Sequence, residues 1–302
     1  MKAILKTLLR RTAARAPWGA RYALLDGCLD GTRLSDIAAH VLPRLRFSEV
    51  AADGDRGTIA SSSADNMVIV EYAQTGTFAP EVTEALRAFF VPAGGTYLDI
   101  GANIGLMTVP FAQDPRVRCL AFEPDPTNFG FLQRNVARNA PGSTVELHQV
   151  ALFKERTTIS LALADGNLGD HRLTIAGVPG RRAVEVTAVP LDDFADRIEP
   201  PLAVKIDTQG AEPFVVAGGW KVLTHAGLLA IEFCPYLMRQ LGGDLEAPIE
   251  LISGFSSVAV MRGGKAEPPR YLTPRDAIRM MRDKLQTAAD SDQDYLDILA
   301  RR

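Results

Sequence analysis

The chain has 302 residues, of which 47% are hydrophobic and 23% are charged, which is ordinary for a globular α/β domain with extensions. Its formal net charge of −3 gives no reason to expect nucleic acid as a partner, because nucleic-acid-binding proteins usually carry a basic face. The three cysteines are scattered and lack paired metal-ligand spacing, which is typical of reduced thiols in a cytoplasmic protein.

The first 16 residues place basic side chains between aliphatic ones, a pattern typical of an amphipathic helix. They contain no continuous apolar segment and no small-residue cleavage site, so they predict no signal peptide, and they are too short and too charged to span a bilayer. Such a helix can lie on a membrane surface, but the favoured interpretation packs it on its own domain or on a partner subunit. We therefore expect no membrane contact and leave a homo-oligomer open.

Residues 48–66 are rich in Ala, Asp, Gly and Ser and predict a domain boundary after a helical N-terminal extension. Residues 67–72 form an apolar run that predicts a strand. A helix should begin near Pro80, which suits a first helical turn, with Glu81 near the positive end of the helix dipole.

The central stretch is residues 96–108, in which an apolar run containing Asp99 ends in a glycine turn before the apolar spacing becomes helical. Gly101 and Gly105 allow the backbone to lie close to a ligand, and the following helix points its free amides into the same space. By itself, this pattern also fits any tight strand-to-helix turn of an α/β domain.

A second apolar run, residues 117–122, ends in Glu123, which lies 22 positions after Gly101. An acidic residue about 20 positions after such a turn lies where the two hydroxyls of an adenosine ribose bind. The dinucleotide fingerprint requires glycine at position 103, where this chain has Asn103, and the Asp99 carboxylate suits a ligand with ammonium and sulfonium groups. The expected cofactor is therefore S-adenosylmethionine, bound by turn and strand-end residues: Asp99, Gly101, Ala102, Asn103, Gly105, Glu123 and Pro124.

The next elements continue the alternation of strand and helix. Residues 127–139 predict a helix that Thr127 caps and Pro141 stops. Residues 145–152 then predict a third strand.

The chain departs from this alternation where a doubly wound sheet would have its next helix. Residues 157–163 and 183–189 alternate between apolar and polar side chains, like the two arms of a hairpin. Insertions over the carboxyl edge of a parallel sheet are where substrate specificity is built, so we expect residues 157–189 to form a substrate lid.

Two further apolar runs predict core strands that end in carboxylates. Residues 202–206 are followed by Asp207, and residues 228–233 carry Glu232. If both strands run parallel to the first, these carboxylates join those of the first two strands along the carboxyl edge of the sheet, where ligands bind in such folds.

Methyl transfer to an alcohol requires a base near the acceptor oxygen, and Asp207 is the first candidate because its strand end should face the methyl group. Asp207 could instead anchor its loop by accepting the amides of residues 210–211. His171 on the lid is the second candidate, since neutral imidazole is a common base, although a lid histidine is more often solvated. Glu232 is the third, with pairing to Lys205 as its structural alternative. Asp207 and Glu232 could share a divalent ion, but no ligand spacing demands a metal.

The last part of the chain is less informative. Residues 255–261 and 271–272 predict a closing hairpin. Pro274 should open a helix, and residues 290–299 should form another.

Four segments of the chain resemble the FkbM-type S-adenosylmethionine-dependent methyltransferases, and their order and spacing cover roughly residues 65–262. The third segment departs slightly from the family, with Gln209 where Glu is common, which weakens any role of position 209 as a base. The resemblance implies O-methylation of a small molecule such as a sugar or a polyketide-type metabolite. The segments are Tyr-Leu-Asp-Ile-Gly-Ala-Asn-Ile-Gly (97–105), Ala-Phe-Glu-Pro-Asp-Pro (121–126), Val-Lys-Ile-Asp-Thr-Gln-Gly-Ala-Glu (204–212) and Ile-Glu-Phe (231–233).

These patterns predict an α/β fold with a doubly wound, mostly parallel sheet, Rossmann-like as in class I methyltransferases, with a β-hairpin insertion and helical extensions at both ends. The expected parts are an N-terminal helical extension (1–64), a methyltransferase domain (65–272) and C-terminal helices (273–302). The expected function is S-adenosylmethionine-dependent O-methylation of a small-molecule hydroxyl acceptor in the cytoplasm. Two alternatives stay open: an NAD(P)-dependent Rossmann oxidoreductase, against which Asn103 argues, and an S-adenosylmethionine-binding protein without catalysis.

Overall fold

The computed structural model describes residues 49–262 and 269–302, which divide into two compact units. Within the described residues, the first unit comprises 49–78 together with Asp165–Gly169. The second comprises Ala79–Ala164 and Asp170–Arg302. The predicted basic helix over residues 1–16 lies outside the described residues, and the domain boundaries at 64 and 272 stay predictions.

The first unit contains an antiparallel hairpin and a helix. β1 (Glu49–Gly54) pairs with β2 (Gly57–Ser62), and α4 (Val68–Thr75) follows. The expectation of a helical extension is therefore wrong for residues 49–62, which are strands and their turn.

The buried side chain of Asp65 explains why α4 is a helix and why the strand expected over residues 67–72 is wrong. Its carboxylate accepts the N–H groups of residues 67–69 at 3.1 to 3.2 Å, which satisfies amides that a new helix leaves unpaired. The Ser61 hydroxyl donates to the same carboxylate at 2.9 Å, so one residue joins the end of the hairpin to the start of the helix.

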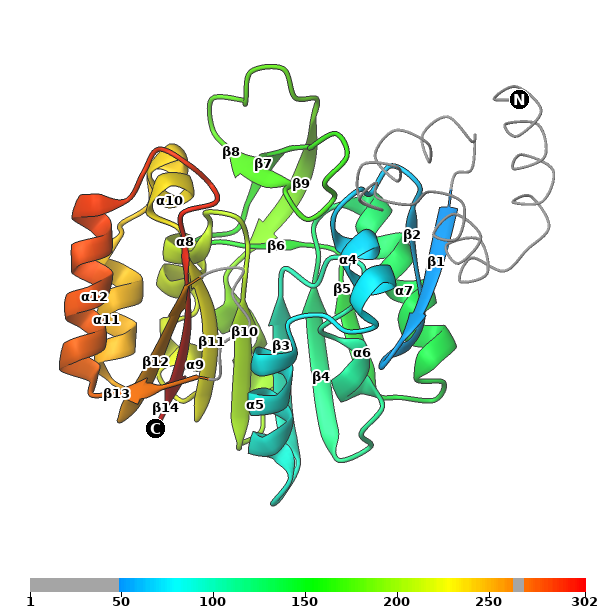
Figure 1. The fold of residues 1–302 in the computed structure, drawn as a ribbon, viewed down its shortest axis with the longest axis horizontal. Helices are drawn as coiled ribbons and strands as arrows, with labels where there is room; N and C mark the ends of the chain where they lie inside the picture. Colours follow the sequence, from blue (N-terminus) through cyan, green and yellow to red (C-terminus); the bar gives the residue numbers. More distant parts are fainter. Residues whose placement is uncertain (1–48, 263–268) are drawn as a thin grey trace, which may run out of the picture. The chain divides into compact units, whose positions relative to one another are not determined.

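The second unit is built on an eight-stranded sheet with strand order β13-β12-β14-β11-β10-β3-β4-β5 (Figure 1). The five strands from β11 to β5 in this order are parallel, which confirms the predicted mostly parallel α/β sheet. All five residues of β10 are buried, as expected of a strand covered on both faces. The strands are β3 (Gly95–Ile100), β4 (Val117–Phe122), β5 (Val145–His148), β10 (Leu202–Ile206), β11 (Leu228–Phe233), β12 (Ser257–Arg262), β13 (Tyr271–Leu272) and β14 (Leu296–Arg301).

Helices alternate with these strands as the sequence predicts. The helix after β4 begins at Pro126, and its N-cap is Asp125 rather than Thr127, because the Asp125 carboxylate accepts the amides of Thr127 and Asn128 at 2.9 and 2.8 Å. The helices of the second unit are α5 (Pro80–Phe90), α6 (Val109–Ala112), α7 (Pro126–Asn139), the 3-10 helix η2 (Leu191–Arg197), α8 (Glu212–Gly218), α9 (Trp220–Leu223), α10 (Pro235–Leu241), α11 (Glu246–Ser253) and α12 (Pro274–Thr287).

The C-terminal segment is a strand, so the expectation of a helix over residues 290–299 is wrong. β14 inserts between β11 and β12 and pairs antiparallel with both. Its Leu296, Ile298 and Ala300 join the core cluster that also contains buried residues of β3, β4, β10, α8 and α11. Burial against two neighbouring strands therefore decides the conformation of this segment.

The predicted insertion forms a second sheet with strand order β6-β9-β7-β8, made of β6 (Ala151–Leu152), β7 (Thr157–Ala162), β8 (Arg172–Thr174) and β9 (Ala183–Val189). β7 and β9 pair antiparallel, as the hairpin pattern predicts. This small sheet lies beyond the carboxyl ends of β3 and β10 (Figure 1). Its core includes Ala211 and Leu241, so the insertion packs on the loop after β10 and on the end of α10. No helix in the described part of the chain is long and apolar enough to cross a membrane.

Candidate active site

The turn after β3 bonds all five of its N–H groups within the protein. Gly101 and Ala102 both donate to the Phe122 carbonyl, at 3.0 and 2.9 Å. Asn103 donates to Glu123 Oε2 at 2.8 Å, and the next two amides donate to the Asn103 side chain and to the Ala102 carbonyl. A dinucleotide site of this type needs such amides for the pyrophosphate, so the turn is unsuited to that ligand.

Gly101 also brings β3 and β10 into contact at this point. It adopts φ +81°, and a Cβ atom there would lie 1.9 Å from the Asp207 carbonyl oxygen. The Asp207 N–H group donates to the Ile100 carbonyl at 3.1 Å. The turn therefore places the end of β10 directly beside the end of β3.

Asp99 is fully buried and faces protein groups instead of open space. Its Oδ2 accepts the Thr108 hydroxyl at 2.6 Å, and its Oδ1 lies 3.4 Å from Lys205 Nζ. Burial would lower the pKa of Lys205, but the charges of Asp99 and Asp207 raise it above its ordinary value. In this structure Lys205 is the cation beside the Asp99 carboxylate, and contact of Asp99 with a ligand ammonium stays a prediction.

Glu123 follows β4, as predicted, and only 5% of its surface is exposed. Its two oxygens accept the amides of Asn103 and Asp125 at 2.8 and 2.9 Å, and burial raises its pKa to about 7. Each carboxylate oxygen has a second lone pair, so Glu123 can accept two further hydrogen bonds, as a vicinal diol would supply. Pro124 lies between Glu123 and the α7 cap and gives this corner its fixed backbone.

Asp207 follows β10, and 43% of its side chain is exposed, which gives it access to a ligand at the carboxyl edge. Gln209 Nε2 donates to Asp207 Oδ1 at 2.9 Å and lies 3.4 Å from Glu232 Oε1. Lys205 Nζ lies 3.8 Å from Asp207 Oδ2. The structure thus brings Asp207 and Glu232 together, as expected, and adds Gln209 between them.

Glu212 anchors the loop after β10, which was the alternative role considered for Asp207. Its buried carboxylate accepts the Thr208 N–H and hydroxyl at 2.7 and 2.9 Å and the Gly210 N–H at 3.0 Å. Burial raises the pKa of Glu212 to about 7. Glu212, and not Asp207, therefore anchors this loop.

Asp297 on β14 belongs to the same group of carboxylates and is absent from the sequence prediction. It lies directly opposite Glu232 in the antiparallel pairing of β11 and β14. Burial and the nearby Asp207 charge raise the pKa of Glu232 well above its ordinary value and that of Asp297 to about 7. Finding Asp297 from the sequence would require recognising its segment as a strand.

His171 lies on the insertion, and 8% of its side chain is exposed. Its Nδ1 accepts the Ala164 N–H at 3.0 Å, so the neutral ring carries its proton on Nε2, which is 4.0 Å from Asp125 Oδ1. This arrangement makes Nε2 a donor, which disfavours His171 as a base. Asp125 follows β4 and Asp207 follows β10, two strands away, or about 10 Å at ordinary strand spacing. The structure therefore places His171 beside Asp125 and away from the predicted base.

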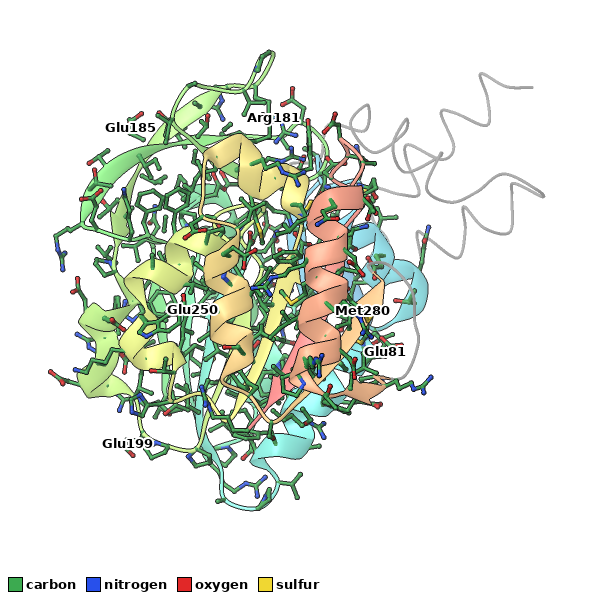
Figure 2. The ribbon with its side chains drawn as sticks, turned by 90° about the vertical axis from the view of Figure 1, so that its left-hand side faces the viewer. Glu81, Arg181, Glu185, Glu199, Glu250 and Met280 are labelled. Carbon is green, nitrogen blue, oxygen red and sulfur yellow. The ribbon has the colours of Figure 1, made fainter. Side chains whose placement is uncertain are left out.

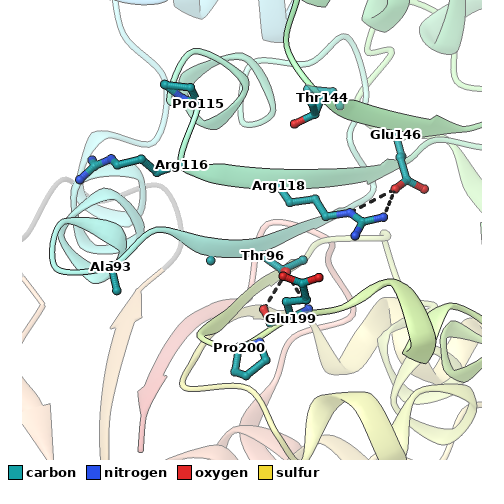
Figure 3. Close-up of a pocket in the computed structure, with 11 residues that line it drawn as sticks. Ala93, Thr96, Pro115, Arg116, Arg118, Thr144, Glu146, Glu199 and Pro200 are labelled. Carbon is teal, nitrogen blue, oxygen red and sulfur yellow. Dashed lines mark hydrogen bonds and ion pairs between the residues drawn. The ribbon is translucent and has the colours of Figure 1, made fainter.

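A pocket near the opposite edge of the sheet is separate from these residues. A pocket of about 690 Å³ opens among the amino ends of β3, β4 and β5, where Arg118 pairs with Glu146 at 2.6 Å and the Thr96 hydroxyl donates to the Glu199 carbonyl at 2.7 Å (Figure 3). Figure 2 shows Glu199 at the opposite end of the second unit from Glu185 of the insertion. Ligands of doubly wound sheets bind at the carboxyl edge, so this pocket is not the candidate active site.

No group of three or more His, Cys, Asp or Glu side chains within residues 49–262 and 269–302 is arranged to hold a metal ion. The carboxylates at the carboxyl edge are instead linked by Lys205 and Gln209. Their chemistry is that of a negatively charged site that accepts protons and hydrogen bonds.

Comparisons with known proteins relate the chain to methyltransferases. Residues 99–241 match the family model described as "Methyltransferase FkbM domain", a range that contains every predicted cofactor and catalytic residue. The 2-O-methyltransferase NoeI of Sinorhizobium fredii (strain NBRC 101917 / NGR234) is 26% identical over 179 residues, which cover 54% of this chain and 72% of that protein. The match to a methyltransferase family argues against the oxidoreductase alternative.

Two solved structures are also similar to the chain, each at 14% sequence identity. M. jannaschii TYW2 in complex with AdoMet has a TM-score of 0.39, and the similarity covers 84% of this chain and 85% of that chain. The magnesium protoporphyrin IX methyltransferase ChlM from Synechocystis PCC 6803, with bound SAM, has a TM-score of 0.37, with 74% and 77% covered.

Proposed function

We propose that the chain is an S-adenosylmethionine-dependent O-methyltransferase, because residues 99–241 match the model of the methyltransferase FkbM domain family. Methyltransferases of this family use S-adenosylmethionine. The similarity to NoeI, whose name states 2-O-methylation, supports an oxygen acceptor. We propose a small molecule with a hydroxyl group, such as a sugar or a polyketide-type metabolite, as the substrate of a cytoplasmic enzyme.

The choice of cofactor depends on one observation, the internal bonding of every amide in the turn after β3. None of these amides is left for a pyrophosphate: the Asn103 amide holds Glu123, and the other four donate to further groups of the protein. The buried Glu123 carboxylate keeps acceptor capacity for a ribose diol. Asp99 is paired with Lys205, whereas Asp207 presents an exposed carboxylate at the edge of the sheet, which suits a ligand with cationic groups. The residues present therefore fit S-adenosylmethionine, which the turn from Gly101 would hold together with the strand end after β4.

For methyl transfer to a hydroxyl group, the protein must position the acceptor oxygen and provide a group that takes its proton. When bound, S-adenosylmethionine supplies a methyl group already activated by its sulfonium centre. Asp207 is the exposed carboxylate of the group, so it is placed to take the proton of an acceptor hydroxyl at the carboxyl edge. Glu232 lies next to it through Gln209, and burial and the nearby Asp207 charge raise the pKa of Glu232 well above its ordinary value.

Calorimetric titration of the purified chain with S-adenosylmethionine and with NAD tests the cofactor. We expect micromolar binding of S-adenosylmethionine, little binding of NAD, and loss of binding in Glu123→Ala. Glu84→Ala removes an exposed glutamate of α5 and should bind like the wild type. Equal or tighter binding of NAD would overturn the proposal.

Incubation with S-adenosylmethionine and a panel of glycosides and polyketide-type alcohols tests the acceptor, with the methylated product identified by mass spectrometry. Asp207→Asn should slow methyl transfer by about 10²- to 10⁴-fold, the usual contribution of a general base. Asp290→Asn changes an exposed residue and serves as the matched control. An Asp207→Asn variant as active as this control would remove Asp207 from the reaction.

A further inference from the structure

Gln209 occupies a backbone conformation that a residue with a side chain adopts only under constraint. It follows β10 in the loop to α8, with φ +55° in the left-handed region. Residues in this region persist where their surroundings determine the conformation, and they cluster at functional sites. The loop therefore holds Gln209 in one orientation at the expense of local strain.

The constraint comes from Glu212, which fixes the backbone on both sides of Gln209. The Glu212 carboxylate accepts the N–H of Thr208 at 2.7 Å and the N–H of Gly210 at 3.0 Å. Gly210 packs so closely that a Cβ atom there would lie 2.7 Å from the Leu237 carbonyl oxygen. The direction in which the Gln209 side chain leaves the loop is thus set by a buried carboxylate and by α10.

The Gln209 amide lies between two carboxyl groups. Its Nε2 donates to Asp207 Oδ1 at 2.9 Å, and Glu232 Oε1 lies 3.4 Å from the same nitrogen. Both neighbours offer oxygen acceptors, so only the NH₂ end of the amide satisfies both, one hydrogen for each. A glutamate of the same length would bring a third carboxyl group and remove both hydrogens.

Each element packed against Asp207, Gln209 and Glu232 contributes a charged or titratable side chain. Lys205 of β10 lies 3.8 Å from Asp207, Glu212 lies at the start of α8, and Asp297 of β14 lies opposite Glu232. The hydrogen bond from Gln209 opposes rotation of the Asp207 carboxylate away from the edge.

We propose that Gln209 is a positioning residue for methyl transfer, whose amide ties the base Asp207 to Glu232 and fixes the orientation of the Asp207 carboxylate. This inference rests on the proposed function, in which Asp207 accepts the proton of the acceptor. Gln209 acts through Asp207 and needs no contact of its own with the reacting atoms.

Gln209→Leu removes the amide at nearly constant volume, and Gln209→Asn keeps an amide that is one methylene too short to reach Glu232 while tolerating the left-handed backbone. Gln113→Leu is the matched control, because Gln113 is a glutamine after α6 whose amide donates to the Asn139 carbonyl, outside the carboxylate group. The melting temperature and the binding of S-adenosylmethionine are measured for each variant on the same samples. Methyl transfer to the acceptor found above gives kcat and KM as functions of pH.

Gln209→Leu should lower kcat roughly 10- to 100-fold with KM for the acceptor nearly unchanged, because the Asp207 carboxylate loses the hydrogen bond that fixes its orientation. Gln209→Asn should show the same direction of change if Gln209→Leu does not fold. A merely structural role would lower stability and leave the kcat of the folded protein unchanged.

The outcomes separate the two proposals. If the wild type binds no S-adenosylmethionine, the proposed function fails, and with it the role in methyl transfer. If the wild type binds the cofactor and transfers methyl groups, but the Gln209 variants have the same kcat as Gln113→Leu, the positioning role alone is overturned.

Discussion

The buried pair of Lys205 and Asp99 gives a sharp test of how the site is held together. Lys205→Met keeps much of the side-chain length but leaves the Asp99 carboxylate, which is 0% exposed, without the ammonium that lies 3.4 Å away. Removing one partner of a buried ion pair costs about 3 to 5 kcal/mol, because the other charge stays buried and uncompensated. At a few degrees per kcal/mol, the melting temperature should fall by roughly 6 to 20 °C.

The assay is urea unfolding near neutral pH followed by circular dichroism, with Lys221→Met, an exposed lysine of α9, as the control within about 0.5 kcal/mol of wild type. Because the pKa of Lys205 is raised in the folded state, its stabilising effect is complete below the ordinary lysine pKa and is lost only as the pH rises through the raised value. The double variant with Asp99→Asn should recover at least about 1 kcal/mol relative to the sum of the single variants. Additive losses, or a Lys205→Met variant as stable as the control, would refute the ion pair as a structural element.

Three further predictions follow from the same geometry. Gly101→Ala should cost more than about 3 kcal/mol, because its Cβ would lie 1.9 Å from a carbonyl oxygen, whereas Gly142→Ala, with a similar φ of +79° and open space, should cost about 1 to 2 kcal/mol in the same urea assay. The pKa of Glu123 is raised from 4.5 to about 7 in the folded state, so its stabilising effect is complete below 4.5 and is lost as the pH rises through about 7. Unfolding measured across this range should therefore show a smaller decline in stability for Glu123→Gln than for the wild type. Leu299→Asp places a charge at a position of β14 that is 0% exposed and should abolish cooperative unfolding, and a variant with a normal transition would show that β14 is dispensable.

The part of the fold that the sequence predicts well is the part encoded by local patterns. The strand, glycine turn and helix after residue 95 are specified within a short segment, because an apolar run, positive-φ glycines and a change of period occur in immediate succession. Glu123 is predicted in the same way, because it directly follows the next apolar run along the chain, which forms β4. β10 and β11 are likewise short, largely apolar runs. Asp207 follows the first, and Glu232 lies near the end of the second, as expected.

The elements that the sequence does not predict depend on partners far away in the chain. The β14 segment becomes a strand because a gap between β11 and β12 buries it, and this gap is formed by residues up to about 70 positions earlier. Asp297 lies next to Glu232 only because β14 pairs with β11, so its place in the site cannot be predicted until the strand order is known. His171 was expected to be a solvated or catalytic imidazole, but its bond from the Ala164 amide arises from the folding of the insertion on itself.

The register of two strands accounts for the charge arrangement of the whole site. Lys205 and Asp99 are direct partners in the parallel pairing of β10 and β3, and Asp207 lies two residues beyond Lys205, on the same face of the sheet. Lys205 therefore contacts one carboxylate inside the sheet and another at its edge. A slip of β10 by one residue would place an apolar side chain beside Asp99 and turn Lys205 to the opposite face, leaving a buried carboxylate unpaired. The ion pair thus selects the register that also brings Asp207, Gln209 and Glu232 together, so the interaction that stabilises the sheet is the one that assembles the proposed proton acceptor.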